Sequence, residues 1–181
     1  MLTLTFRAAK MARACLRSYE KFAKFKGGVT KWGTDKPFPL LEVLDNNGLQ
    51  DALWALNCCR PTEERDRISR LFACDCSERV LPIFEKQYPE DKRPRQAIEV
   101  ARRFANGKAT LKEIEAASLA AHAAYSAAYW AAYAAAYWAA YAAYAAYAAC
   151  LAAQAACLAA QAAGSAEREW QEKHFREMIS E

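Results

Sequence analysis

The segment AHAAYSAAYWAAYAAAYWAAYAAYAAYAACLAAQAACLAAQAA, residues 121–163, decides the fold of this chain. It contains no Gly or Pro, and no Asp, Glu, Lys or Arg occurs between Glu115 and Glu167. Alanine has the highest helix propensity, and Gly and Pro have the lowest, so the segment is predicted to be helical. A helix with so few polar side chains has to bury most of its surface. We therefore predict an all-α fold: a compact multi-helix bundle with close-packed Ala/Tyr-rich central helices.

The length of the Ala-rich tract, residues 116–163, limits how it can be arranged. One straight helix would span on the order of 70 Å at about 1.5 Å per residue, which is longer than a compact domain of this size. We expect the tract to break into shorter helices that pack closely through Ala. In the alternative arrangement the tract projects and pairs with another chain, forming a structural homo-oligomer through the Ala/Tyr face.

Aromatic residues recur regularly in this tract. Tyr is found every four residues from Tyr125 to Tyr141 and then every three to Tyr147, while Trp130 and Trp138 belong to an eight-residue repeat. We interpret these side chains as core residues. They would alternatively be exposed and bind a protein partner, since Tyr and Trp are enriched in binding hot spots. A bilayer span is disfavoured because the aromatics form no interfacial belts, and stacking on single-stranded nucleic acid because no Lys or Arg is interleaved.

The rest of the chain is also predicted to be helical. The expected helices are Ala8–Phe25, Phe38–Leu44, Leu49–Cys59, Thr62–Phe72, Glu78–Tyr88, Pro94–Ala105 and Ala166–Ile179. Ser77 is the expected N-cap of the fifth of these helices, in which Pro82 should produce a kink or delay the start. Thr110 and Glu113 are predicted to form a capping box. The only alternating, strand-like run is Leu2–Phe6.

Charge divides the 181-residue chain unevenly. Residues 1–36 contain nine Lys or Arg against two acidic residues, whereas the remainder contains sixteen basic and nineteen acidic residues. We expect residues 1–36 to be a basic N-terminal helical segment and residues 37–181 to be a helical domain that includes the tract, with one domain overall. A basic helical face of this kind is able to bind nucleic acid. The residues of this alternative function are Arg7, Lys10, Arg13, Arg17, Lys21, Lys24 and Lys26. Most of them recur at spacings of three and four, which would place them on one helix face.

Catalysis and metal binding have little support in the sequence. No nucleophile-elbow, phosphate-binding or zinc-protease motif is present. The seven cysteines lack the Cys-x-x-Cys spacing of common zinc sites, and His122 and His174 are isolated. The start of the chain has no apolar core typical of a secretory signal. We therefore expect a cytoplasmic, non-enzymatic protein with free thiols, no metal, no cofactor and no membrane association.

Two neighbouring motifs resemble a known family. They read CDCSERVLPIFEK at residues 74–86 and YPEDKRPRQAIE at residues 88–99, and they are followed by a helix that ends at Gly107 and by the Ala-rich tract. This pattern, with Trp54 upstream, resembles the putative immunity proteins found beside bacterial polymorphic toxins and in phage or prophage genomes. The resemblance covers roughly residues 49–163. This chain departs from it by carrying Tyr and Trp where the family has more His and Arg, and by its basic N-terminal segment.

The resemblance implies a protein that acts by binding another protein, as an immunity or antitoxin-like inhibitor. Steric occlusion of a toxin would be its mechanism. Toxins often have charged active clefts, and charge pairs set the association rate and the specificity of such complexes. The predicted partner-binding residues are therefore Arg93, Arg95 and Arg102, together with Trp130 and Trp138. The other functions considered are a nucleic-acid-associated phage protein and the structural homo-oligomer.

Overall fold

The computed structural model describes residues 1–127 and 165–180, and these residues are predominantly helical. The helices are α1 (Phe6–Met11), α2 (Leu16–Phe25), α3 (Val29–Trp32), α4 (Leu40–Asn47), α5 (Leu49–Ala55), the 3₁₀ turn η1 (Leu56–Cys58), α6 (Glu63–Gln87), α7 (Arg93–Ala105), α8 (Leu111–Ala127) and α11 (Ser165–Ser180). The all-α prediction is confirmed. Helix α8 includes the first part of the Ala-rich tract, but most of that tract, with its expected central position, lies outside the described residues.

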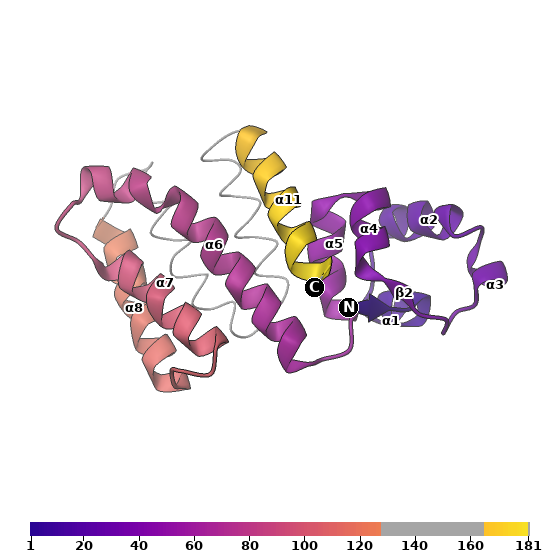
Figure 1. The fold of residues 1–181 in the computed structure, drawn as a ribbon, viewed down its shortest axis with the longest axis horizontal. Helices are drawn as coiled ribbons and strands as arrows, with labels where there is room; N and C mark the ends of the chain where they lie inside the picture. Colours follow the sequence, from indigo (N-terminus) through magenta and orange to yellow (C-terminus); the bar gives the residue numbers. More distant parts are fainter. Residues whose placement is uncertain (128–164, 181) are drawn as a thin grey trace.

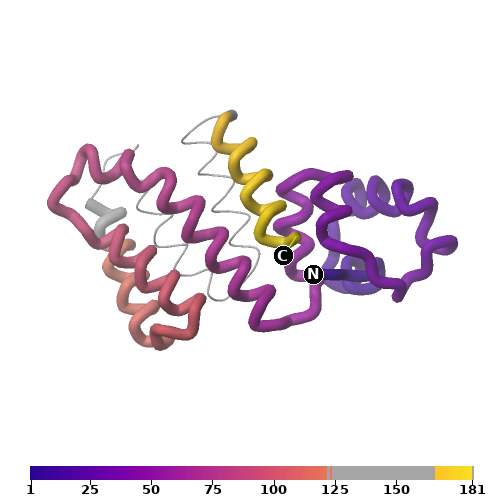
Figure 2. Tube along the Cα trace, in the orientation of Figure 1, coloured from indigo at the N-terminus to yellow at the C-terminus, as the bar shows by residue number. Residues whose placement is uncertain are grey.

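The small helices and the long helices occupy different parts of the molecule. Helices α1–α5 lie on one side, helices α6–α8 lie on the other, and α11 lies between α6 and the α4–α5 pair (Figure 1). Helix α11 contacts α4, α5 and α6, and α7 packs against both α6 and α8. The tube drawing shows α6, α7 and α8 running back and forth beside one another (Figure 2). Segments distant in the sequence are thus joined through α11.

A short antiparallel pair of strands anchors the N-terminal residues. Strand β1 (Thr3–Leu4) pairs with β2 (Phe38–Pro39), with Thr3 opposite Pro39 and Leu4 opposite Phe38. The alternation from Leu2 to Phe6 follows from this pairing, because Leu2, Leu4 and Phe6 are buried while Thr3 is exposed. The ladder is only two residues long on each strand, which is why it gives no convincing strand signal in the sequence.

The predicted helix Ala8–Phe25 is wrong, because the chain turns between α1 and α2. Arg13 has a φ of 59°, in the left-handed region that ends helices, and the N–H of Ala14 donates to the carbonyl of Ala9. In one straight helix Phe6 and Phe22 would be about 24 Å apart along the axis. The turn instead brings their ring centroids to 6.0 Å and lets both pack on Phe38. Burial of three phenylalanines overrides the local helical pattern.

The predicted helix boundary at Ser77 is also wrong. Helix α6 runs without a break from Glu63 to Gln87 and is capped by Thr62, whose side chain accepts a hydrogen bond from the N–H of Arg65. Ser77 is buried in mid-helix, and its Oγ donates to the carbonyl of Ala73 at 2.8 Å. Pro82 has no N–H, so the carbonyl of Glu78, four residues earlier, loses its helical hydrogen bond. Pro82 and Glu78 are both exposed, so water is able to hydrogen-bond to that carbonyl, and the helix continues through Pro82.

Other local predictions are confirmed. Helix α7 has Pro94 in its first turn, and Gly107 follows its end with a φ of 69°. The capping box before α8 is formed in both directions. The N–H of Thr110 donates to Glu113 Oε2 at 2.7 Å, and the N–H of Glu113 donates to Thr110 Oγ1 at 3.3 Å. The start of α8 was therefore predictable from the sequence, because it depends on a capping interaction between residues three positions apart.

Candidate partner-binding surface

The second sequence motif contains the stretch Arg93-Pro94-Arg95, called here the RPR motif. Its two arginines lie at the turn between α6 and α7, which we call the α6–α7 corner (residues 85–96). Arg93 donates from Nε and Nη2 to Asp91 at 2.8 and 2.5 Å, and Arg95 donates from Nε and Nη2 to Glu85, both at 2.7 Å. Bidentate guanidinium–carboxylate pairs of this kind fix both the position and the plane of the cation. These hydrogen bonds hold the pKa values of Asp91 and Glu85 below their usual range.

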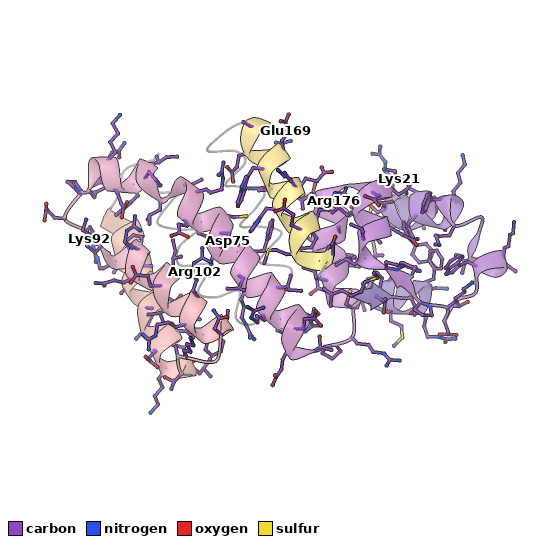
Figure 3. The ribbon with its side chains drawn as sticks, viewed as in Figure 1. Lys21, Asp75, Lys92, Arg102, Glu169 and Arg176 are labelled. Carbon is purple, nitrogen blue, oxygen red and sulfur yellow. The ribbon has the colours of Figure 1, made fainter. Side chains whose placement is uncertain are left out.

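Both guanidinium groups remain available to a partner. The side chains of Arg93 and Arg95 are 40% and 42% exposed. A guanidinium has five N–H donors, so each arginine keeps donors that its own carboxylate does not use. Lys86 and Lys92 are exposed on the same corner, and Lys92 marks that end of the molecule in Figure 3. The two arginine side chains are thus already ordered before a partner binds, so binding costs less side-chain entropy.

Arg102 is the most enclosed of the three predicted arginines. Its Nη2 lies 2.5 Å from Asp75 Oδ1 and 2.5 Å from Glu78 Oε2, and its side chain is 34% exposed. Asp75 and Glu78 belong to α6 and Arg102 belongs to α7, so this arginine joins the two helices (Figure 3). The structure therefore brings Arg93 and Arg95 together at the corner and places Arg102 away from it, in an ion-paired contact between helices.

Asp75 also contacts α11, which sequence reasoning did not find. His174 Nε2 lies 2.6 Å from Asp75 Oδ2, and the imidazole stacks on the ring of Trp170 with centroids 4.7 Å apart. The sequence suggested that His174 is isolated, but in the structure it contacts both Asp75 and Trp170. Asp75 and His174 are 99 positions apart, so no local spacing could reveal the pair. We call Asp75, Arg102 and His174 the Asp75 cluster.

A second polar contact joins α11 to α6 beside this cluster. Arg79 Nε donates to Glu167 at 2.6 Å, and the Arg79 guanidinium lies 4.1 Å from the centroid of the Trp170 ring. Glu167 is buried and also accepts a hydrogen bond from Gln171 Nε2 at 3.3 Å. A buried carboxylate needs such partners to offset its loss of hydration. Helix α11 is therefore positioned by charged and aromatic contacts together.

The buried thiols among the described residues have raised pKa values. Burial raises the pKa of the Cys58 thiol to about 11 and those of the Cys59 and Cys74 thiols to about 12. Such thiols are poor nucleophiles near neutral pH. Within residues 1–127 and 165–180, no three His, Cys, Asp or Glu side chains are grouped as metal ligands would be. No helix in those ranges is both long and apolar enough to span a bilayer.

The basic N-terminal residues do not form the single helix face that their spacing suggested. Arg7 pairs with Asp35, while Lys26 pairs with Glu42 at 2.5 Å and lies 3.5 Å from the centroid of the Trp32 ring. The other five are exposed, and the turn at Arg13 separates Lys10 on α1 from the cations of α2. These five are Lys10, Arg13, Arg17, Lys21 and Lys24. Trp130 and Trp138, the remaining predicted site residues, lie outside the described residues.

Comparison with known proteins adds a family to this geometry. The family model of the Imm-5 like putative immunity proteins matches residues 60–178, about two thirds of the chain. The chain belongs to this family. The resemblance inferred from the two motifs is thereby confirmed. The matched region of this Imm-5 like protein contains the α6–α7 corner, the Asp75 cluster and most of α11, whereas helices α1–α5 precede it. No curated protein and no solved structure matches the chain.

Membership of the Imm-5 like family implies a protein partner, such as a toxin, and suggests a non-catalytic role. These two statements agree with the character of the α6–α7 corner, which offers exposed arginines held in position by neighbouring carboxylates.

Proposed function

We propose that this chain is an immunity protein that binds a toxin and blocks it by steric occlusion, with the α6–α7 corner as part of the contact surface. Arg93 and Arg95 supply the positive charge of that surface. Family membership carries the proposal, because the matched residues contain the corner. The exposure of the two guanidinium groups, each already fixed by its own carboxylate, supports the choice of residues.

The roles of the other predicted residues follow from their positions. Arg102 acts mainly by holding α7 against α6, since its Nη2 contacts two carboxylates of α6. It therefore stabilises the packing of the two helices that form the corner, and it contacts the toxin less than Arg93 and Arg95 do. Trp130 and Trp138 remain proposed contacts on the Ala-rich tract. Tryptophan and arginine are both enriched among the residues that dominate binding hot spots.

The first test is capture and neutralisation. The tagged full-length chain serves as bait in extracts of the native host, and any captured protein is purified and titrated with the chain in an activity or toxicity assay. An equimolar complex that abolishes the toxic activity of the partner supports the proposal. Capture of nucleic acid alone, lost as salt rises, would instead favour the basic N-terminal residues. Self-association alone would favour the homo-oligomer.

The second test addresses the corner. The double variant Arg93→Glu with Arg95→Glu should raise the Kd for the captured toxin at least about ten-fold, or ~1.4 kcal/mol, measured by calorimetry. The matched control is Lys24→Glu with Lys31→Glu, which makes the same charge change at exposed sites outside the matched region. Circular dichroism checks that both variants fold. An unchanged Kd in the corner variant would remove these arginines from the contact surface.

A further inference from the structure

A cavity of about 580 Å³ lies in the N-terminal region, outside the part of the chain that matches the family. We call it the N-terminal pocket. Its floor is apolar and consists of buried side chains from β1, α1, α2, β2 and α4: Leu4, Phe6, Phe22, Phe38 and Val43. The half-buried rings of Tyr19 and Trp54 also line it. Cavities of this volume with mostly apolar and aromatic walls are typical of binding sites.

The mouth of the N-terminal pocket is positively charged. Arg17 and Lys21 line it, are exposed, and are four residues apart on α2, so they share one helix face. Neither cation forms an ion pair with any described residue. Asp51 also lines the pocket and contributes one negative charge against these two cations; its carboxylate accepts a hydrogen bond at 2.7 Å from Asn47, which ties α4 to α5. Lys10 and Arg13 add exposed positive charge at the adjoining end of α1.

Exposed apolar side chains lie next to this mouth in the sequence. Met11 is 78% exposed and Leu16 is 69% exposed, and they flank Ala14 and Cys15, which line the pocket. Large apolar side chains left in water beside a cavity are typical of a surface that a partner covers. These charged and apolar side chains flank the segment that lines the cavity, so a polypeptide is able to contact them together with the cavity, whereas one small molecule in the cavity is not.

We propose that the N-terminal pocket binds an acidic polypeptide segment of a partner, which inserts one bulky apolar side chain into the cavity and places carboxylates against Arg17 and Lys21. A nucleic acid fits this surface less well, because its phosphates would meet the cations but leave the apolar cavity empty. The ring of Tyr19 is moreover engaged edge-on with Phe6 at 5.5 Å, which limits base stacking. This interaction is separate from the proposed inhibition of a toxin by the α6–α7 corner.

Cys15 provides a local reporter of occupancy. Its exposed thiol lies at the start of α2 and lines the pocket, and backbone N–H groups of Ser18 and Arg17 lower its pKa. The other cysteines among the described residues are buried. Alkylation of Cys15 by iodoacetamide, followed by mass spectrometry of its own peptide, therefore measures access to the mouth of the pocket and is read separately from Cys150 and Cys157, which lie outside the described residues.

The experiment uses the full-length chain and a display library of acidic peptides, each with a single central Leu, Phe, Met or Trp. We expect selection of peptides that bind with micromolar Kd in fluorescence anisotropy and slow Cys15 alkylation at least about ten-fold at saturation. Replacing the central apolar residue of a selected peptide by Ser should abolish binding. Replacing its acidic residues by Asn and Gln should weaken binding at least about ten-fold.

Variants of the chain localise the interaction. Arg17→Glu with Lys21→Glu, and separately Ala14→Trp to obstruct the cavity, should each raise the Kd of the selected peptide at least about ten-fold. The matched control, Arg168→Glu with Lys173→Glu on exposed positions of α11, should not change it. Thermal unfolding shows whether each variant folds. If Ala14→Trp does not fold, protection of Cys15 in the unaltered chain decides the outcome.

Several outcomes would overturn the proposal: no peptide is selected, the selected peptides do not protect Cys15, or the central apolar residue does not matter. Protection of Cys15 by dodecanoate without any peptide binding would overturn it in favour of a small anionic amphiphile. Binding of oligothymidylate that is unaffected by Ala14→Trp, again without peptide binding, would favour a nucleic acid. None of these readouts uses the toxin or the α6–α7 corner, so failure here and failure of the proposed immunity function are distinguishable.

Discussion

The N-terminal region (residues 1–59) and the family-matched region both have apolar cores, but in the family-matched region ion pairs between helices add to the apolar packing. In the first, the rings of Phe6, Phe22 and Phe38 lie with centroids 4.7–6.0 Å apart in an apolar cluster. In the second, the Asp75 cluster and the Arg79–Glu167 pair connect separate helices through charge. Apolar burial supplies free energy with little directional preference, whereas paired charges require defined positions. A surface that presents fixed arginines is accordingly found in the second region.

The largest effect should come from removing an aromatic ring of the N-terminal cluster. Phe38→Ala is expected to lower the free energy of unfolding by about 3–5 kcal/mol, because Phe38 is 2% exposed and contacts both Phe6 and Phe22. Urea unfolding measures the change. Leu16→Ala, at an apolar residue that is 69% exposed, is the control and should cost less than about 0.5 kcal/mol. Equal losses in the two variants would contradict the apolar account of this region.

A smaller loss is expected from Asp75→Asn, which keeps the shape of the side chain and removes its charge. The substitution leaves Arg102 and His174 without their shared carboxylate, and Asp75 is only 17% exposed, so we expect a loss of about 2–3 kcal/mol. A double-mutant cycle with His174→Gln should give a coupling free energy above about 0.5 kcal/mol. Asp35→Asn is the exposed control and should have little effect. Additive changes at Asp75 and His174 would show that this contact contributes nothing.

The smallest effect should appear on acidification, and the α6–α7 corner is one of the places where it should be seen. The pKa values of Glu85 and Asp91 are lowered by their hydrogen bonds to Arg95 and Arg93, so the pairs stabilise the corner above the ordinary carboxylate range. That stability is lost as the pH falls through the lowered pKa values. Hydrogen-exchange protection of residues 92–98 should therefore decrease toward pH ~3, while that of α4 is maintained. A parallel loss in α4 would indicate global unfolding instead.

The sequence predicted the class of fold and the features that depend on near neighbours. Ala content, the Thr110–Glu113 capping box and Pro94 in the first turn of α7 each act over a few residues, so they could be read directly. The RPR motif likewise indicated a cluster of charge at the α6–α7 corner. Its arginines pair with carboxylates that are close in the sequence, Asp91 two residues from Arg93 and Glu85 ten residues from Arg95.

The remaining features depend on residues far apart in the sequence. The turn at Arg13 exists because Phe6 and Phe22 share one cluster with Phe38, which no local pattern shows. The continuity of α6 through Ser77 follows from the burial of that face of the helix against its neighbours. The pairing of Asp75 with His174 spans 99 residues. A helical spacing of charges predicts a shared face only if the helix is unbroken, and this condition fails in residues 6–25.

The position of α11 has a consequence for how the protein is made. Phe175 and Ile179 belong to the same apolar cluster as Leu44 and Leu56, and the ring of Phe175 lies 5.0 Å from that of Phe72. Translation at about 5–20 residues per second needs on the order of ten seconds to pass from Leu56 to Phe175. During that interval the nascent N-terminal helices expose the apolar surface that α11 later covers. A ribosome-bound chain should consequently be a substrate for chaperones until α11 emerges.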